Sequence, residues 1–290
     1  MGKSNRSNSK NRKATDTVAW IVVASVLVTV LTGNSIAQNN ADRDFDHRVW
    51  GSLLHSHVKV FDRGSSTRVD YQGMLTDRGV LQSYLQELAA VTRERFNGWT
   101  RDARLAFLIN AYNAWTVELI LTEYPELDSI KDLGFLFRSP WSRRFVPLFG
   151  EEVSLDTIEH EMIRGPDGYG EPRIHFAVNC ASIGCPALRP EAFTAVRLEQ
   201  QLEEATRLFL ADRKRNRLDG DTLRVSRIFD WYEEDFEIGW RGTWSVAQFL
   251  SRYPAALQLP DAVVAALLQS RFRVRYLDYD WGLNDLSRDR

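Results

Sequence analysis

Residues 101–123 read RDARLAFLINAYNAWTVELILTE, and the rest of the chain is expected to pack around them. Thr100 is a helix N-cap, Pro125 stops the helix, and the side chains between leave almost no polar face. A helix that is apolar all round is a central, buried one. Asn110 and Asn113 stand three residues apart and therefore on the same side. Because an unpaired buried amide costs about 1–3 kcal/mol, we expect both to bond a fixed backbone segment or a site.

Shorter elements are expected on both sides of this helix. Apolar spacing predicts helices over 80–95, 156–164, 190–211, 228–236, 246–253 and 262–269. Strands or extended segments are expected over 58–61, 68–71, 144–149, 153–155, 173–178, 218–225 and 272–277. Helices and antiparallel hairpins are mixed rather than alternating, which is typical of the α+β class. The sequence therefore predicts a single α+β domain with a buried central helix, several shorter helices and a small, mainly antiparallel sheet.

The first 37 residues have the features of an export signal. A basic leader precedes an apolar run over residues 18–31, and small residues follow at Ser35 and Ala37. The run is shorter than the roughly 20 residues that span a bilayer core. We expect residues 1–37 to be a signal peptide or an N-terminal membrane anchor, with membrane association through 18–31. Residues 42–290 would then form the single domain, exported to the periplasm or the cell exterior.

The composition excludes several classes of protein. Lys and Arg number 37 against 39 Asp and Glu, and losing a leader with five basic residues and one acid takes the net charge from −2 to −6. An acidic domain is not expected to bind nucleic acid, which needs a basic surface. Two cysteines do not make a disulfide framework. We find no glycine-rich phosphate loop or dinucleotide fingerprint, so no nucleotide cofactor is expected.

The reactive residue types converge on residues 175–186, which read HFAVNCASIGCP. The expected strand delivers His175 and then ends in a loop that holds Cys180 and Cys185. Cys180 is a candidate nucleophile, and unpaired backbone N–H groups in such a loop would favour its thiolate. His175 or His160 would be the base. A carboxylate or amide would orient the imidazole, and the candidates are Asn113, Asp235 and Asp280.

Three other interpretations of this loop stay open. Cys180 and Cys185 are five residues apart and would form a redox or structural pair if the loop turns back. With His160 and His175 they have the ligand types of a zinc site, but the spacing lacks a C-x-x-C pair, and no metal is expected. A buried, inert cysteine would make the domain a binding or scaffold module. The remaining histidines, His47, His55 and His57, are expected at the surface.

Five motifs in order resemble the domain of unknown function 547 family, over roughly residues 105–284. They are 110–114 (NAYNA), 158–160 (IEH), 175–186, 230–236 (DWYEEDF) and 279–284 (YDWGLN). Members of this family keep a cysteine at the place of Cys180 and often have serine at that of Cys185. The resemblance therefore favours Cys180 as the functional thiol over an obligatory disulfide. It also implies that Asn113, His160, His175 and Asp235 are family positions worth testing.

These observations lead to one functional prediction and its rivals. We expect a cell-envelope hydrolase or acyl/amide transferase that acts through Cys180 on a small molecule or peptide. The alternatives are a non-enzymatic binding or scaffold module and a Cys180/Cys185 redox pair.

Overall fold

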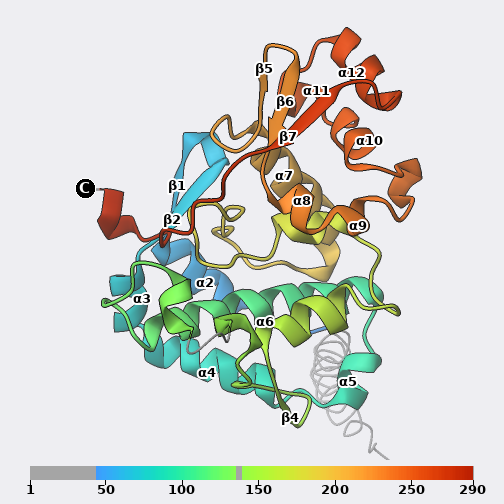
Figure 1. Cartoon of the computed structure of the whole chain (residues 1–290). Helices are drawn as coiled ribbons and strands as arrows, with labels where there is room; N and C mark the ends of the chain where they lie inside the picture. The colour runs from blue at the N-terminus through green and yellow to red at the C-terminus, as the bar shows by residue number, and fades with distance from the viewer. Residues whose placement is uncertain (1–43, 135–138, 290) are drawn as a thin grey trace, which may run out of the picture. The chain divides into compact units, whose positions relative to one another are not determined.

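Helix α6, Arg101–Leu121, is the central element, as the sequence predicts (Figure 1). The structure is a computed structural model that describes residues 44–134 and 139–289. The hydroxyl of Thr100 caps α6 by accepting a hydrogen bond from the backbone N–H of Ala103 at 3.2 Å. Seventeen of the 21 residues of α6 are buried, so tertiary packing stabilises it on all sides.

The elements before and around α6 form the first layer of the domain. Within the described residues, four helices precede α6 in the chain, and two antiparallel hairpins complete this layer (Figure 1). The helices are α2 (Arg48–His57), α3 (Tyr71–Thr76), α4 (Arg78–Ala89) and α5 (Arg93–Asn97). Helices α3 and α4 pack against α6, and α2 packs against α3 and α4. The hairpins are β1 (Val58–Phe61) with β2 (Ser66–Val69), and β3 (Val146–Leu148) with β4 (Glu151–Val153).

The second layer contains the C-terminal helices and a three-stranded sheet. The helices are α7 (Leu198–Ala211), α8 (Ile228–Trp231), α9 (Glu233–Phe236), α10 (Val246–Ser251), α11 (Pro254–Leu257) and α12 (Asp261–Leu268). The strands are β5 (Arg217–Asp219), β6 (Thr222–Val225) and β7 (Arg273–Tyr276). Strand β6 pairs antiparallel with β5 and parallel with β7. The α+β class and the mainly antiparallel pairing are thus confirmed.

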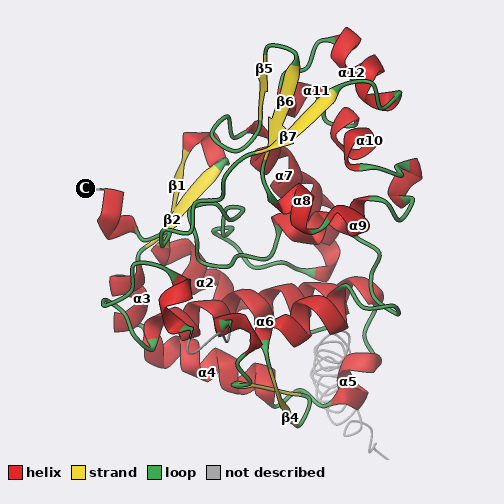
Figure 2. Ribbon diagram, in the orientation of Figure 1, coloured by secondary structure: helices red, strands yellow, loops and turns green. Residues whose placement is uncertain are grey.

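Each layer has its own apolar core, and one irregular segment joins them. The first core surrounds α6, and the second lies among α7 to α10. The 3-10 helix η5, Pro172–Phe176, places Ile174 in the first core and Phe176 in the second. Figure 2 shows the chain after η5 as irregular backbone between the layers. His175 therefore lies at the boundary between them.

Four predicted elements are wrong in kind or extent. The predicted helix 80–95 is divided, because α4 ends at Ala89 and α5 begins at Arg93. Residues 173–178 do not form a strand, because Pro172 and the side chain of Glu171, which accepts from the N–H of Arg173, start η5 instead. Helix α7 begins at Leu198 rather than near residue 190. The backbone N–H and C=O of Phe193 are bonded to the Asn110 amide, which holds residues before α7 out of the helix. The predicted helix 228–236 is divided into α8 and α9.

Two histidines expected at the surface are buried. His47 is 7% exposed and lies 2.8 Å from the hydroxyl of Tyr84, and His57 is 8% exposed and lies 2.8 Å from Asp77. Both histidines contact α4 or the residue that precedes it. The sequence alone does not show that α2 packs against α4. His55 is exposed, as predicted.

The predicted export signal, residues 1–37, and its apolar run 18–31 lie outside the described residues. The chain from Asp44 onward folds as one unit. Within the part that the structure describes, none of the helices combines the length and apolarity needed to cross a membrane.

Candidate functional site

Arg173 anchors η5 to helix α7. Its guanidinium is 1% exposed and donates to Glu171 and Glu199, with a distance of 2.7 Å to each at its Nη2. A buried guanidinium is stable only when carboxylates satisfy its donors, and here the N-cap of η5 (Glu171) and the first turn of α7 (Glu199) supply them. This clamp fixes the position of His175, two residues further along.

Asn113 holds the loop that follows η5. Its Nδ2 donates to the carbonyl of Ala177 at 3.0 Å, and its Oδ1 accepts from the backbone N–H of Asn179 at 2.8 Å. The expectation that the buried amides of α6 bond a fixed backbone segment is therefore confirmed. Asn179 in turn closes the loop by donating to the carbonyl of Pro186 at 2.7 Å. Asn113 thus bonds the main chain of the loop rather than an imidazole.

The loop closed by Asn179 carries a disulfide between Cys180 and Cys185. The loop turns back and joins the two sulfurs, as in the interpretation of a redox or structural pair, whereas the family resemblance favours Cys180 as a functional thiol over an obligatory disulfide. The two cysteines differ in exposure. Cys180 is half-buried at the wall of a cavity, whereas Cys185 is 3% exposed.

Hydrogen-bond donors surround both sulfurs. The hydroxyl of Tyr279 lies 3.2 Å from Sγ of Cys180 and 3.2 Å from Sγ of Cys185. The hydroxyl of Ser182 lies 3.1 Å from Sγ of Cys180, and the backbone N–H of Cys180 donates to Sγ of Cys185 at 2.8 Å. Disulfide sulfurs can only accept, so both hydroxyls donate. The same donors would stabilise a thiolate at either position.

The C-terminal segment brings Tyr279 to the loop. The backbone N–H of Ile183 donates to Gly282, and that of Gly184 donates to Asp280, each at 2.8 Å. A Cβ at Gly184 would come within 2.9 Å of the Tyr279 ring, so only glycine allows this close approach. Residues about 95 positions apart are thereby fixed against each other.

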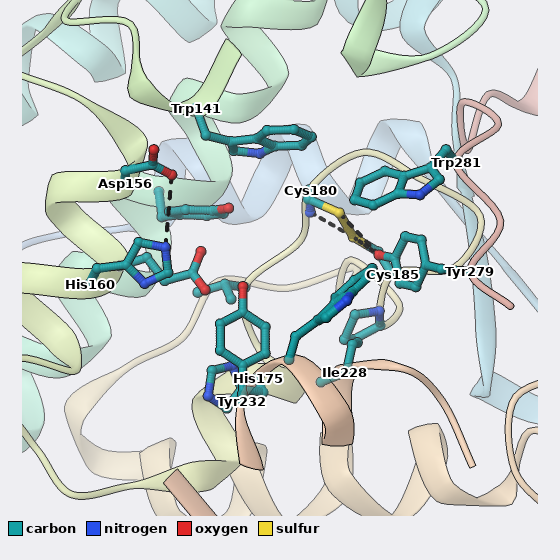
Figure 3. A pocket seen from close by; sticks show the side chains of 15 residues that line it. Trp141, Asp156, His160, His175, Cys180, Cys185, Ile228, Tyr232, Tyr279 and Trp281 are labelled. Atoms are coloured by element: carbon teal, nitrogen blue, oxygen red, sulfur yellow. Dashed lines mark hydrogen bonds and ion pairs between the residues drawn. A yellow bond between two sulfur atoms is a disulfide. The ribbon is translucent and has the colours of Figure 1, made fainter. Parts of the chain in front are cut away.

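A cavity of about 160 Å³ lies in front of the disulfide. Figure 3 shows Asp156 and His160 on one side of it and the disulfide with Tyr279 and Trp281 on the other. Six aromatic residues form much of its wall, and the acids Asp156 and Glu159 also line it. The aromatic residues are Tyr112, Trp141, Trp231, Tyr232, Tyr279 and Trp281.

Arg164 links the two candidate histidines. Its Nε donates to Oδ2 of Asp235 at 2.5 Å, and its Nη1 donates to Nδ1 of His160 at 2.5 Å. Nε2 of His175 lies 2.6 Å from the same Oδ2 of Asp235. Because arginine cannot accept a hydrogen bond, Nδ1 of His160 must be unprotonated. His160 is therefore the neutral tautomer with its proton on Nε2, which lies 3.9 Å from Asp156.

The buried His175–Asp235 pair shifts the pKa of each partner. Burial lowers the pKa of His175 against the opposing hydrogen bond from Asp235. Burial alone would raise the pKa of Asp235, but hydrogen bonds from His175 and Arg164 outweigh it and lower that pKa. Asp235 therefore stays ionised and orients the His175 ring, which stacks on Tyr232 with 4.0 Å between ring centroids.

Glu159 lies between two tyrosines. Burial, together with the neighbouring Glu159 carboxylate, raises the pKa of both Tyr112 and Tyr232, and both hydroxyls are hydrogen-bonded to Glu159. The phenols therefore keep their protons and donate to the carboxylate. Glu159 is 6% exposed and forms no salt bridge with any residue in the described part of the chain.

The structure thus brings together most of the predicted site residues, in an arrangement that differs from a thiol–imidazole pair. His175 and Asp235 are bonded, His160 joins them through Arg164, and Cys180 lines the same cavity. The sulfur of Cys180, however, contacts Cys185, Ser182 and Tyr279 instead of a histidine. Asn113 lies behind the loop as its support.

Sequence reasoning missed Arg164, Glu159 and Tyr279 as functional residues. Glu159 directly precedes His160 on the π-helical segment η4, Thr157–Ile163, and Arg164, the residue that caps its C-terminal end, lies four residues after His160. That spacing was a usable signal. Tyr279 is bonded to a loop far away in the sequence, and only the fold reveals it.

Comparison with known proteins gives a family without an assigned activity. Residues 96–210 match the family model described as "Protein of unknown function, DUF547". The matched residues include Asn113, His160, His175 and Cys180, whereas Asp235 follows them. Neither the curated proteins nor the solved structures gave a match to the chain. Among the residues that the structure describes, no group of three or more His, Cys, Asp or Glu is arranged to hold a metal ion.

Proposed function

We propose that the Cys180–Cys185 disulfide exchanges with thiols bound in the aromatic cavity, so that the domain is a thiol–disulfide oxidoreductase. The observation that carries this proposal is the asymmetry of the two sulfurs. Cys180 is half-buried at the cavity wall, and Cys185 is 3% exposed behind it. Both cysteines line the cavity, but the sulfur of Cys180 is the more accessible to an incoming thiol, which sets the order of the steps.

The donors around the disulfide suit this chemistry. Exchange is faster when the leaving sulfur is stabilised as a thiolate. When the bond breaks, the departing Cys185 sulfur would accept from the hydroxyl of Tyr279 and from the N–H of Cys180. The Cys180 sulfur, when it leaves in the second step, would accept from Ser182 and Tyr279. Each thiolate thus has two donors already in place.

The steps balance with a thiol as the only co-reactant. A substrate thiolate attacks Sγ of Cys180, and the electron pair of the Cys180–Cys185 bond goes to Sγ of Cys185. A second substrate thiolate attacks the substrate sulfur of this mixed disulfide and releases Cys180 as a thiolate. The protons of the two substrate thiols end on the two cysteines. The substrate is oxidised to a disulfide and the protein is reduced, and the same steps in reverse oxidise the protein with a substrate disulfide.

Trapping the mixed disulfide tests the proposal. The full-length Cys185→Ser variant is treated with 2-hydroxyethyl disulfide and followed by intact mass. We expect a mixed disulfide at Cys180, formed at least about tenfold faster than at Cys185 in the matched Cys180→Ser variant, because Cys180 is half-buried whereas Cys185 is 3% exposed. No adduct at Cys180 would overturn the proposal and leave the disulfide as a structural link in a binding or scaffold module.

A cysteine-dependent hydrolase or acyl/amide transferase is the second candidate. The observation that favours it is the His175–Asp235 hydrogen bond, because His175 lines the same cavity as Cys180. It requires the reduced protein. Hydrolysis of p-nitrophenyl acetate by reduced protein, abolished in both Cys180→Ser and His175→Gln, would support the hydrolase. Loss in neither variant would refute it.

We also propose that the domain acts outside the cytoplasm, on a small molecule or peptide, with membrane association through residues 18–31. An oxidising compartment would maintain the Cys180–Cys185 bond. Fractionation of cells that express the full-length chain tests this. A protein confined to the cytosol would contradict it.

A further inference from the structure

We propose that the cavity selects a thiol that carries a positively charged amine, with the ammonium group at the Glu159 end and the sulfur at Cys180. This inference rests on the proposed thiol–disulfide exchange and names the class of its substrate. Among the residues that the structure describes (44–134 and 139–289), the cavity walls carry two carboxylates and no Lys or Arg side chain. A cation is therefore the ligand group that the walls lack.

The strongest single observation is the state of Glu159. Its carboxylate lines the cavity, is 6% exposed, and receives hydrogen bonds from the hydroxyls of Tyr112 and Tyr232. Two neutral donors satisfy part of its hydrogen-bonding capacity, and within residues 44–134 and 139–289 no Lys, Arg or His forms a salt bridge with it. Burial of an unpaired charge is costly, so an ammonium ion that enters the cavity would gain an ion pair at a carboxylate that is already desolvated.

The neighbouring polar groups do not supply this charge. His160 accepts from Arg164 at Nδ1, so its ring is neutral and presents Nε2–H toward Asp156. Asp156 itself is a second carboxylate on the same wall. His175 is kept neutral by burial, which lowers its pKa. The acidic end of the cavity is thus lined by two carboxyl groups and two imidazoles, and the one nearby guanidinium that the structure describes, that of Arg164, is bonded to His160 and Asp235 rather than to either of these carboxyl groups.

The aromatic walls favour the same ligand. The face of a Trp or Tyr ring attracts an ammonium ion, more strongly when water is excluded. Two rings of the cavity already bind cations that do not line it. Nζ of Lys131 lies 3.5 Å from the centroid of Trp281, and the guanidinium of Arg164 lies 4.7 Å from that of Tyr232. An anionic thiol would meet both the carboxylates and the negative ring faces.

The size and rim of the cavity limit the ligand. A volume of about 160 Å³ accommodates a compact aminothiol or one cationic side chain next to a cysteine. Trp231 is 43% exposed at the rim, which leaves a path from solvent. The substrate class is therefore a small aminothiol, or a peptide cysteine beside a basic group.

A charge series of thiols tests this inference. We would measure the rate of Cys180–Cys185 reduction in the full-length protein by cysteamine, 2-mercaptoethanol and 3-mercaptopropionate, at equal thiolate concentration and fixed ionic strength. These thiols have similar length and carry a positive, zero and negative charge. We expect cysteamine to react about tenfold faster than 2-mercaptoethanol, because the acidic wall attracts its ammonium group. We expect 3-mercaptopropionate to be the slowest, because the same wall repels its carboxylate.

Two variants assign the effect. Glu159→Gln should reduce the ratio of the cysteamine rate to the 2-mercaptoethanol rate to near one, and Asp156→Asn should reduce it partly. Glu161→Gln is the matched control, because Glu161 is exposed and does not line the cavity. If Glu159→Gln fails to fold, the comparison of the three thiols on the wild-type protein still tests the preference for an amine.

The outcomes separate the two proposals. Reduction by none of the thiols would mean that the proposed exchange is wrong. Reduction by all three at equal rates, or an unchanged ratio in folded Glu159→Gln, would overturn the amine preference and leave the exchange standing.

Discussion

The hydroxyl of Tyr279 donates a hydrogen bond to Sγ of Cys185 at 3.2 Å. Its oxygen lies equally close to Sγ of Cys180, so one donor serves both ends of the disulfide. Burial raises the pKa of Tyr279 well above its usual value, and the phenol keeps its proton. Whichever sulfur becomes a thiolate therefore finds this donor in place, which makes Tyr279 the first residue to test.

Replacing Tyr279 by Phe should slow reduction of the disulfide. A hydrogen bond to a charged group contributes about 1.5–3 kcal/mol, so its loss predicts a rate lower by about tenfold or more. The rate is followed by quenched alkylation after addition of dithiothreitol. Tyr276→Phe is the control, because Tyr276 keeps its ring packing and bonds neither sulfur. Equal rates in both variants would show that the Tyr279 hydroxyl does not stabilise the leaving thiolate.

Removing the amide of Asn113 should loosen the loop. Asn113→Ala leaves the carbonyl of Ala177 and the N–H of Asn179 without their partner, at a cost of about 2–4 kcal/mol. Asn110→Ala is matched in burial and frees two backbone groups of Phe193 instead. Urea unfolding should show similar destabilisation of both.

The two variants should differ at the disulfide. Only Asn113→Ala is expected to change the rate of Cys180–Cys185 reduction, because only Asn113 bonds the loop that carries the cysteines. A rate changed equally by Asn110→Ala would indicate a general loosening of the first core rather than a local support.

The elements that the sequence predicted well are those set by local chemistry. Helix α6 was predicted with its N-cap at Thr100, and its buried Asn side chains were expected to bond backbone, because propensity, capping and burial agree along one stretch. The β5–β6 hairpin follows from the glycine at 220, whose φ of +59° suits a tight turn.

The parts that failed depend on partners distant in sequence. The short alternation around Ile174 resembles a strand, but the bonds from Arg173 to α7 favour a 3-10 turn. The parallel pairing of β6 with β7 joins segments some fifty residues apart. A five-residue spacing of Cys180 and Cys185 permits either a free thiol or a bridge, and the position of the loop decides between them.

The free energy of unfolding should fall as the pH drops below 6.5, because His47 is buried in its neutral form. Burial lowers the pKa of His47 from 6.5 to about 3, so the folded state resists protonation while the unfolded state takes up a proton. This contribution to stability is present above pH 6.5 and is lost between 6.5 and about 3, at about 1.4 kcal/mol per pH unit. His175 acts in the same direction, because burial lowers its pKa too.

Urea unfolding at several pH values measures this slope. His47→Phe should flatten it by about one proton, even if the loss of the Tyr84 contact lowers stability overall. His55→Gln, at an exposed position of the same helix, should leave the slope unchanged. A wild-type slope that His47→Phe does not alter would mean that other groups carry the pH dependence.

His160 should be the tautomer with its proton on Nε2. Nη1 of Arg164 lies 2.5 Å from Nδ1 of His160 and can only donate, so a proton on Nδ1 would oppose two donors. The ¹⁵N shifts of His160 at neutral pH should show an unprotonated Nδ1 and a protonated Nε2. Arg164→Met removes the donor and should shift the ring toward a mixture of tautomers, whereas Arg207→Met, at an exposed ion pair on α7, should not. A protonated Nδ1 in the wild-type protein would break the link from His160 to Asp235, and with it the argument that the acidic end of the cavity holds a neutral imidazole.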